Sequence, residues 1–446
     1  MTYDEAKAFL DTTKQYGSVL GLTSIRDLMA DLGDVQETLS IIHVAGTNGK
    51  GSVCAMIAEI LKEAGYLVGR YSSPAVFSYE EIYQVDGASI SHADYAKCME
   101  SVMASCGHLT AAGKPHPTAF EIETALAFLY FANQQCDFVI LETGMGGATD
   151  ATNLISSPVC SVLTDISRDH MGFLGDSLAE IAGVKAGIIK QGRPVVTLCQ
   201  KPEAMAVIEE RAKQLNAELI LAKEDRICSI RYNADGMEIV CDGRENEKPF
   251  HEEGGQAVRA ISEKLRLHLL LTGAHQVRNA LLALTVSEAL CDMGYHIFRE
   301  HMLAGFEKAR WAGRFETIHK EPRIIIDGAH NEGAAEKLKD TIENCFTNQP
   351  ITYIIGVLAD KEHEKMLRLL LPYAKKVYAV TPDNPRALSG EALYMEAQKY
   401  HSDVTCAESV GQAVACAVAN AGKEEVILAF GSLSYLGQVK EAVKQL

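Results

Sequence analysis

A glycine-rich stretch at residues 46–52, Gly-Thr-Asn-Gly-Lys-Gly-Ser, constrains the fold of this chain more than any other feature. The apolar residues 41–45 come directly before it and predict a β-strand. Behind it, apolar side chains recur at helical spacing at Val53, Met56, Ile57, Ile60 and Leu61. The stretch is therefore expected to form a turn between a strand and the N-terminus of a helix. Free backbone N–H groups and the positive end of the helix dipole favour an anion at such a place.

The residue types in this turn suit a phosphate ligand. Its glycines lack the Cβ atoms that would keep a phosphate away from the backbone. Lys50 supplies a positive charge for the outer phosphates, and the Ser52 hydroxyl can bind a magnesium ion. Val44 occupies the position of the first glycine in the pattern G-x-x-x-x-G-K-[ST], so this is a shortened relative of that loop. The competing interpretation is an ordinary strand–turn–helix corner that binds nothing.

The size and charge of the chain limit what it can be. Its 446 residues exceed the length at which one hydrophobic core usually stops growing, so two domains are expected. A net charge of −17 argues against a nucleic-acid or anionic-membrane surface, and no apolar run is long enough to span a bilayer. The 12 cysteines include no C-x-x-C pair, and the first residues do not form a signal peptide. We therefore expect a cytoplasmic protein with reduced thiols.

Two predicted strands lead to residues that suit a metal ion. The apolar strand at 136–142 ends with Glu142, and a glycine-rich turn follows it. Open α/β sheets bind ligands at the carboxyl ends of their parallel strands, so Glu142 is a candidate ligand for Mg²⁺. His170 follows another predicted strand at 159–164. A histidine after a strand is usually structural, but a strand that neighbours Glu142 makes it a candidate metal ligand.

Ser73 and Lys185 each allow more than one interpretation. Ser73 comes after a short predicted strand at 66–71 and directly before Pro74, where it is either a turn residue or a metal-bound hydroxyl. Lys185 lies among small and apolar residues, where a bare ammonium would lose its hydration. Such a lysine gives up its proton, pairs with an acid or is chemically neutralised. Composition alone does not choose among these.

The alternation of strands and helices predicts an α/β protein with two domains. Residues 227–241 alternate around Asp235-Gly236, which is typical of a β-hairpin. Later strands, with helices between them, are expected at 323–327, 353–357, 377–381 and 426–430. We predict a P-loop-type N-terminal domain, residues 1–296, with a mostly parallel sheet and a small hairpin region. A smaller, Rossmann-like C-terminal domain would follow at residues 297–446.

Taken together, the motifs resemble those of a known family. The chain resembles the Mur-ligase-type ATP-dependent amide ligases, and within them the folylpolyglutamate synthase/dihydrofolate synthase family. The matching motifs occur in one order over nearly the whole length: Gly46–Ser52, Ser73-Pro74, Glu142 before Gly144-Met145-Gly146-Gly147, Asp150-Ala151-Thr152-Asn153, Asp169-His170, Lys185-Ala186-Gly187-Ile188, His275-Gln276 with Asn279-Ala280, Gly313-Arg314, Asp327-Gly328-Ala329-His330-Asn331 and Gly431-Ser432. Each motif is weak by itself, and their shared order makes the resemblance strong.

The resemblance implies a role for each matching residue. ATP would be bound by Thr47, Asn48, Gly49, Lys50, Gly51, Ser52, Asn279, Arg314 and Asp327, the last of these at the ribose. Two Mg²⁺ ions would be held by Ser52, Ser73, Glu142, His170 and Lys185, with Lys185 carried as a carbamate. The pterin of a folate would face Phe120 and Glu121, and L-glutamate would bind at His330 and Ser432. The implied catalytic residues are Lys50, Glu142, His170 and Lys185, and K⁺ is a further cofactor compatible with the family.

The reaction implied by the resemblance is ATP-dependent amide formation between a folate and L-glutamate. A carboxylate does not react usefully with an amine in water, because oxide is a poor leaving group. Transfer of the γ-phosphoryl group gives an acyl phosphate, which the glutamate amine then attacks with release of phosphate. Lys50, Arg314 and the metal ions would neutralise charge during the transfer. The partners would be small molecules, with no nucleic acid or membrane, and the family-like default is a monomer.

Two positions leave the substrate open, and two other functions compete. Ala75 replaces a histidine that is common after Ser-Pro, and Glu81 replaces a common arginine near the expected pterin, so the acceptance of dihydropteroate is undecided. A Mur-type ligase acting on a UDP-linked cell-wall precursor would need a UDP-binding domain. Only about forty residues precede the phosphate loop, too few for such a domain. A non-catalytic nucleotide-binding protein of the same fold is the other alternative, and the joint presence of Glu142, His170 and Lys185 disfavours it.

Overall fold

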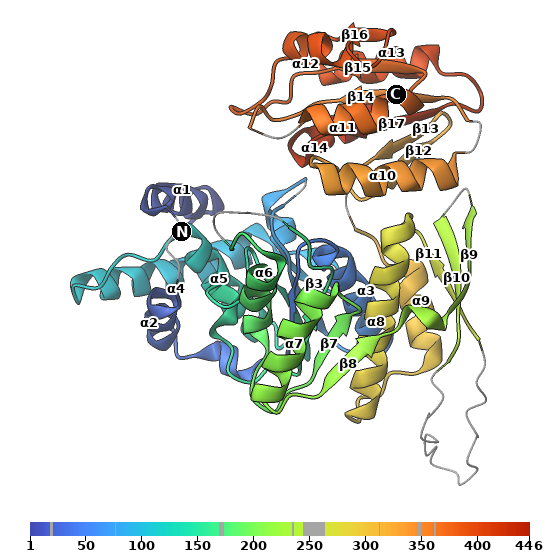
Figure 1. Ribbon diagram of the computed structural model, residues 1–446. Coiled ribbons are helices and arrows are strands. Elements are labelled where there is room, and N and C mark those ends of the chain that lie inside the picture. The colour runs from blue at the N-terminus through green and yellow to red at the C-terminus, as the bar shows by residue number, and fades with distance from the viewer. Residues whose placement is uncertain are drawn as a thin grey trace. The chain divides into compact units, whose positions relative to one another are not determined.

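Figure 1 shows the computed structural model of the chain. The structure describes residues 1–17, 21–75, 77–168, 174–233, 236–243, 264–311, 313–346, 349–360 and 363–446. It forms two compact units, a first unit of Met1–Ser229, Val240–Leu267 and Arg278–Ala309, and a second unit of Ile230–Ile239, His268–Val277 and Arg310–Leu446. Within the described ranges, no helix combines the length and the apolar character that crossing a bilayer requires.

The first unit is built on an eight-stranded sheet with the order β4-β3-β2-β5-β1-β6-β7-β8. Its strands are β1 Ile41–Ala45, β2 Val68–Tyr71, β3 Tyr83–Val85, β4 Ala88–Ser89, β5 Phe138–Glu142, β6 Cys160–Leu163, β7 Val195–Leu198 and β8 Leu219–Ala222. The strands from β2 to β8 in this order are parallel, and β3 and β4 add an antiparallel edge. Because β1 lies between β5 and β6, the loop that follows β1 meets the carboxyl ends of both neighbours.

Helices surround this sheet, and several begin at side-chain caps. They are α1 Tyr3–Thr13, α2 Thr23–Asp31, α3 Lys50–Glu63, α4 His92–Ala111, α5 Ala119–Asn133, α6 Leu178–Lys185, α7 Pro202–Gln214 and α9 Arg299–Lys308. In Figure 1 the helices α1, α2, α4 and α5 gather around the N-terminus, and their apolar faces share one core with residues of β2 and β5 such as Tyr71 and Leu141. Capping boxes start α1, α5 and α6, and satisfy N–H groups that helix termini leave free.

A three-stranded sheet has the order β11-β10-β9, with β9 Ile227–Asn233, β10 Gly236–Cys241 and β11 Leu265–Leu269. Strands β9 and β10 are the two arms of the hairpin predicted over 227–241. Gly236, at the start of β10, has φ +151°, and an added Cβ there would lie 2.0 Å from the carbonyl oxygen of Leu269. A residue with a side chain would therefore push the neighbouring strand away. Asp235, the other predicted turn residue, lies outside the described residues.

Helix α8, Ala274–Asp292, ends before the sequence-based domain boundary, and helix α9 begins after it. The units divide after Ala309, whereas the sequence-based boundary falls after residue 296. The physical reason is that α9 packs on α3 of the first unit. A Cβ added at Gly305 would lie 2.6 Å from the Cα of Ile60, so only a glycine allows the two helices to come this close.

The second unit carries a six-stranded sheet with the order β12-β13-β17-β14-β15-β16. Its strands are β12 Glu316–Lys320, β13 Arg323–Ile326, β14 Ile351–Ile355, β15 Lys376–Ala379, β16 Val404–Cys406 and β17 Val426–Phe430, and its helices are α10 Glu332–Cys345, α11 His363–Leu370, α12 Gly390–Ala397, α13 Val410–Asn420 and α14 Leu436–Lys444. All neighbouring strands pair in parallel except β12 with β13. The predicted α/β class with two sheet-based parts is confirmed.

Four of these strands, β13, β14, β15 and β17, match the sequence-based prediction. The edge strands β12 and β16 were not predicted. Their residues are mostly half-buried or exposed, so they lack the continuous apolar pattern that identified the central strands.

Candidate active site

The predicted phosphate loop is a turn from β1 into α3, and two of its glycines are required by the packing. Gly46 has φ +154°, and an added Cβ would lie 1.8 Å from Thr164 Oγ1. Gly49 has φ +90°, and an added Cβ would lie 2.4 Å from Asn279 Oδ1. The predicted strand–turn–helix is confirmed, with α3 beginning at Lys50. Thr164 and Asn279 therefore form two walls of the loop.

The side chains of the loop hold its own backbone. Lys50 Nζ donates hydrogen bonds to the carbonyl oxygens of Gly46 and Thr47, at 3.2 and 3.4 Å. The Lys50 ammonium thus lies next to the backbone of the turn that precedes it in the chain. Gly51 and Ser52 belong to the first turn of α3, and Ser52 is buried. The turn, its lysine and the helix N-terminus therefore have the local arrangement that the sequence predicts.

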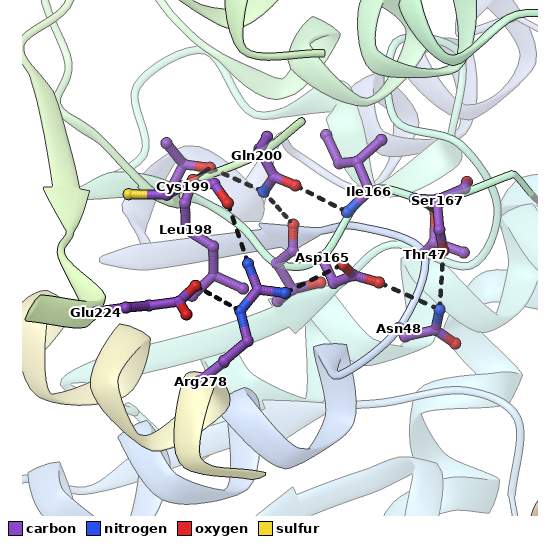
Figure 2. Close-up of polar contacts among 12 residues, drawn as sticks. Thr47, Asn48, Asp165, Ile166, Ser167, Leu198, Cys199, Gln200, Glu224 and Arg278 are labelled. Atoms are coloured by element: carbon purple, nitrogen blue, oxygen red, sulfur yellow. Dashed lines mark hydrogen bonds and ion pairs between the residues drawn. The ribbon is translucent and has the colours of Figure 1, made fainter. Parts of the chain in front are cut away.

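The loop is also fixed to the segment after β6. The backbone N–H of Thr47 donates to the carbonyl oxygen of Asp165 at 2.7 Å, and the Thr47 hydroxyl donates to the carbonyl oxygen of Ser167 at 3.0 Å. Asn48 Nδ2 donates to Ser167 Oγ at 3.0 Å and to Asp165 Oδ2 at 3.4 Å. Figure 2 shows the contacts of the Asn48 side chain, together with Gln200, which bonds the backbone on both sides of Asp165. Asp165 and Gln200 carry no motif signal, and the sequence interpretation gave them no role.

Buried hydroxyl groups mark the strand ends around the loop. Ser72 Oγ, Thr143 Oγ1 and Thr164 Oγ1 are buried and have no hydrogen-bond partner within the part of the chain that the structure describes. They directly follow β2, β5 and β6, three strands that lie on either side of β1. Buried polar atoms usually have a partner. Three such atoms at adjacent strand ends therefore indicate a polar ligand at this edge of the sheet.

The same edge carries the predicted metal-binding residues. Glu142 is the last residue of β5, pairs in register with Val44, and is 5% exposed. Ser73 follows β2, the neighbour of β5. No group of three His, Cys, Asp or Glu residues with metal-binding geometry occurs in the described ranges, and His170 lies outside them. A buried carboxylate with nearby hydroxyls is a donor set that suits Mg²⁺, which prefers oxygen ligands and retains water and phosphate oxygens.

Arg70 adds a positive charge that sequence reasoning missed. The two neighbours of Arg70 in β2, Gly69 and Tyr71, are on the face of the sheet that α5 covers. A Cβ added at Gly69 would lie 2.7 Å from the side chain of Phe131 in α5. Side chains alternate along a strand, so Arg70 points to the opposite face of the sheet. Its guanidinium donates a hydrogen bond to Gln84 on β3. Burial lowers the pKa of Arg70, and the nearby Glu142 carboxylate acts against this shift.

Lys185 is the last residue of α6 and lies directly against the phosphate loop. It is 3% exposed, and its Nζ donates a hydrogen bond to the carbonyl oxygen of Gly46 at 2.8 Å. Gly147 allows α6 this close approach, because an added Cβ would lie 2.7 Å from the carbonyl oxygen of Val184. The glycine pair after Glu142 thus brings Lys185 to the loop.

A buried polar chain stabilises the turn after Glu142. Asp150 accepts hydrogen bonds from the Met145 N–H at 2.8 Å and from the Thr152 hydroxyl at 2.5 Å. His43 Nε2 lies 2.9 Å from Thr152 Oγ1. Since the threonine proton is directed to Asp150, His43 is the donor in that contact. Burial lowers the pKa of His43 to about 3, and the positive charge of Lys190 adds to this effect.

The residues predicted to face a pterin lie at the start of α5. The Glu121 carboxylate accepts hydrogen bonds from the Thr118 N–H at 2.8 Å and from the Thr118 hydroxyl at 2.9 Å. Glu121 therefore completes a capping box, for which the T-x-x-E spacing is the sequence signal. The ring of Phe120 covers Gly144, where an added Cβ would lie 2.5 Å from Cζ. Phe120 is thus brought to the turn that follows Glu142, whereas the Glu121 carboxylate is engaged with the helix cap.

The predicted residues of the second unit lie at two adjacent strand ends. Asp327 follows β13 and accepts hydrogen bonds from the N–H groups of Phe315 and Ala329, each at 2.9 Å. Burial raises the pKa of Asp327, while the charge of Arg314 opposes this. His330 Nδ1 lies 2.8 Å from the carbonyl oxygen of Gly328.

Ser432 follows β17, the neighbour of β13 in the sheet. The Gly431 N–H donates to the carbonyl oxygen of Ala329 at 2.9 Å. This bond holds the two loops that carry His330 and Ser432 together.

Two family models match the chain in the expected order. The Mur ligase middle domain matches residues 44–287, which is more than half of the chain, and the Mur ligase, glutamate ligase domain matches residues 313–433. The first match includes the end of β1, the predicted phosphate loop, Glu142 and Lys185. The second includes Arg314, Asp327, His330 and Ser432.

Complete proteins resemble the chain over nearly its whole length. Dihydrofolate synthase/folylpolyglutamate synthase of Bacillus subtilis (strain 168) is 34% identical over 444 residues, covering 99% of both chains. The structure of Mycobacterium tuberculosis folylpolyglutamate synthase complexed with ADP and AMPPCP has a TM-score of 0.82 at 29% identity, and covers 99% of this chain and 97% of that chain. The structure of E. coli FolC in complex with DHPP and ADP has a TM-score of 0.80 at 28% identity, and covers 99% and 98%. The chain therefore belongs to the folylpolyglutamate synthase/dihydrofolate synthase family of the Mur ligases, and it is an ATP-dependent ligase.

Proposed function

We propose that this ligase joins L-glutamate to a folate through an amide bond, with an acyl phosphate as the intermediate, and that dihydropteroate is a second acceptor. One observation carries the proposal: Lys50, Lys185 and the Gly46–Ser52 loop form one hydrogen-bonded group at the carboxyl edge of the sheet. Glu142 ends the strand beside β1 at that edge. Family members of nearly equal length carry the names of both activities.

The triphosphate of ATP would bind along the phosphate loop. The N-terminal N–H groups of α3 and the Lys50 ammonium would face the β- and γ-phosphates. Arg314, which precedes β12, is proposed to contact a phosphate, and Asp327, which follows β13, is proposed to contact the ribose. Charge neutralisation and positioning are the main requirements for γ-phosphoryl transfer to the folate carboxylate.

Mg²⁺ would be held by oxygen ligands from Ser52, Ser73 and Glu142. A bound magnesium ion supplies charge stabilisation to phosphate oxygens during the transfer. His170 is proposed as a ligand of a second ion. K⁺ is proposed as a second type of cation beside Mg²⁺, without assigned ligands.

Lys185 is proposed to carry a carbamate. Its Nζ is buried and adjoins a backbone carbonyl that belongs to the phosphate loop. A buried ammonium loses hydration, whereas a carbamate is an oxygen donor that suits a divalent cation. The modification would turn the lysine from a cation into an anionic ligand beside the loop.

The acceptor and the incoming glutamate would be bound by residues of both units. Phe120 and the turn at Gly144 are proposed to contact the pterin, with Glu121 holding the helix that carries Phe120. His330 and Ser432 would bind the incoming glutamate. We further propose a monomeric, cytoplasmic enzyme whose partners are small molecules and which binds neither nucleic acid nor membranes.

Product analysis tests the function directly. The chain is incubated with ATP, Mg²⁺ and L-glutamate, together with dihydropteroate, a reduced folate or a UDP-linked cell-wall precursor. Mass spectrometry of each acceptor is expected to show the addition of one glutamate or more to the folate and to dihydropteroate, and none to the UDP-linked compound. Glutamate added only to the UDP-linked compound would overturn the proposal. Lys50→Ala serves as the inactive control.

A further inference from the structure

Arg278, near the start of α8, bridges three segments of the first unit, as Figure 2 shows. Its Nε donates to Glu224 Oε1 at 2.7 Å, and its Nη2 donates to the carbonyl oxygen of Cys199 at 3.0 Å. Its Nη1 forms an ion pair with Asp165 Oδ1 at 3.5 Å. The guanidinium thus connects the ends of β6 and β7 with the segment after β8.

Asp165 passes this connection on to the phosphate loop. Its second carboxylate oxygen, Oδ2, accepts the hydrogen bond from Asn48 Nδ2, and its carbonyl oxygen accepts those from the N–H groups of Thr47 and Asn48. One acidic residue therefore contacts Arg278 on one side and the first half of the phosphate loop on the other. Neither Arg278 nor Asp165 was predicted to take part in the site.

The residue after Arg278 contacts the second half of the same loop. Asn279 lies so close to Gly49 that an added Cβ would come within 2.4 Å of its Oδ1. Residues His268–Val277 belong to the second unit, and the next segment of the first unit begins at Arg278. Asn279 thus lies against the second half of the loop directly, whereas Arg278 is connected to the first half only through Asp165.

The negative charge of Asp165 would oppose the binding of a triphosphate at the loop unless a cation such as Arg278 lies beside it. Its carboxylate lies beside the loop at which the triphosphate is proposed to bind, and like charges at short range repel. Arg278 is fixed next to this carboxylate and offsets its charge. The two side chains are 32% and 23% exposed, and ion pairs of this kind contribute little to stability. Their effect on a bound polyanion is therefore expected to exceed their effect on folding.

We propose that Arg278 is a positioning residue for ATP, which neutralises Asp165 and through it holds Thr47 and Asn48 in the phosphate-binding conformation. The proposal rests on the proposed placement of the triphosphate at Thr47–Ser52. Arg278 acts through Asp165 and is not proposed to contact the reacting atoms.

Steady-state kinetics and a charge-compensation cycle test the proposal in the full chain. Arg278→Ala is expected to raise the KM for ATP about tenfold and to change kcat less than twofold, because the loop is misplaced while the reacting groups remain. Asp165→Asn keeps an acceptor for Asn48 and removes the carboxylate charge. The double variant Arg278→Ala/Asp165→Asn is therefore expected to recover most of the lost affinity for ATP. Glu224→Gln, which removes only the charge of the outer partner of Arg278 and keeps an oxygen acceptor, is the matched control and is expected to leave the KM for ATP unchanged.

Nucleotide binding separates failure of this proposal from failure of the proposed phosphate site. Calorimetry with a non-hydrolysable ATP analogue is expected to show weakened binding for both Lys50→Ala and Arg278→Ala, with the melting temperature of Arg278→Ala close to that of wild type. Normal binding by Lys50→Ala would refute the placement of the triphosphate. Weakened binding by Lys50→Ala with normal binding by Arg278→Ala would refute only the role of Arg278. A double variant no better than Arg278→Ala would also refute it.

Discussion

Lys185 Nζ lies 2.8 Å from the carbonyl oxygen of Gly46 and donates a hydrogen bond to it. The contact joins the last residue of α6 to the first residue of the phosphate loop, 139 positions earlier in the chain. Lys185 is the lysine that the sequence places among apolar residues. The contact brings it directly against the loop that the sequence predicts to bind an anion.

The proposed carbamate predicts a chemical rescue. Lys185→Ala is expected to lower ligase activity at least ~10-fold, because a metal-supporting group is lost, and added acetate or formate should restore part of it. Lys190→Ala, which alters a half-buried lysine bonded to the Asn153 carbonyl, should not respond to these carboxylates. NMR of the wild-type protein in ¹³C-bicarbonate should show a carbamate signal that Lys185→Ala lacks. The same spectrum in both proteins would count against the modification.

Lys50 is predicted to matter for catalysis and not for folding. Lys50→Ala is expected to reduce ATP-dependent ligation by ~10²–10³-fold, the usual loss when one positioned charge donor is removed. The melting temperature should change little, since the lost bonds join a partly exposed side chain to two carbonyl oxygens at 3.2 and 3.4 Å. Lys62→Ala, at the other end of the same helix, is the control and should remain active. A fully active Lys50→Ala enzyme would contradict the phosphate assignment.

The close contact between Gly46 and Thr164 predicts a structural penalty. Gly46→Ala would place a methyl group 1.8 Å from Thr164 Oγ1 at a φ of +154°. We expect a loss of ~1–3 kcal/mol in the free energy of unfolding from overpacking and backbone strain, measured by urea denaturation. Gly183→Ala, in α6, meets its nearest neighbour only at 3.9 Å and should be neutral or stabilising. Equal stabilities for the two variants would show that the turn relaxes freely.

Burial of neutral His43 predicts a loss of stability in acid. Because its pKa falls from 6.5 to about 3 in the folded protein, the unfolded chain takes up a proton that the folded chain does not. The stability contributed by this residue is present above pH 6.5 and is lost as the pH falls toward 3. Between pH 6.5 and 5 the loss amounts to ~2 kcal/mol.

A variant isolates this contribution from other titrating groups. His43→Gln can keep a donor toward Thr152 without titrating in this range. Its free energy of unfolding, followed by urea denaturation from pH 7 to pH 5, should fall by ~2 kcal/mol less than that of wild type. The same pH dependence in both proteins would show that protonation of His43 does not lower the free energy of unfolding.

Several parts of the site could be predicted because their signals are local. The strand at 41–45, the glycine turn and α3 are adjacent in the chain, so residue spacing alone specified them. Glu142 was found because a buried parallel strand is a continuous apolar run with a recognisable end. The capping role of Glu121 could also have been found, since Thr118 stands three residues before it.

Other parts depend on which strands become neighbours. The order β5-β1-β6 brings Asp165 to Thr47 and Asn48, more than 100 residues away in the chain. Arg278 reaches Asp165 across 113 positions, and His43 reaches Thr152 across 109. No sequence pattern identifies the partner of any residue in these pairs, so spacing and composition could not predict the contacts.

The sequence by itself determined the α/β class, the strand–turn–helix around Lys50 and the family, because these follow from short-range periodicity and from ordered motifs. Only the tertiary structure decided that Thr164 and Asn279 pack against the glycines of the loop. It also decided that Lys185 donates a hydrogen bond to Gly46 and that Arg278 pairs with Asp165. The physical reason is that side-chain contacts between distant segments depend on strand order and helix packing, which arise from the summed burial of the whole core rather than from any one segment.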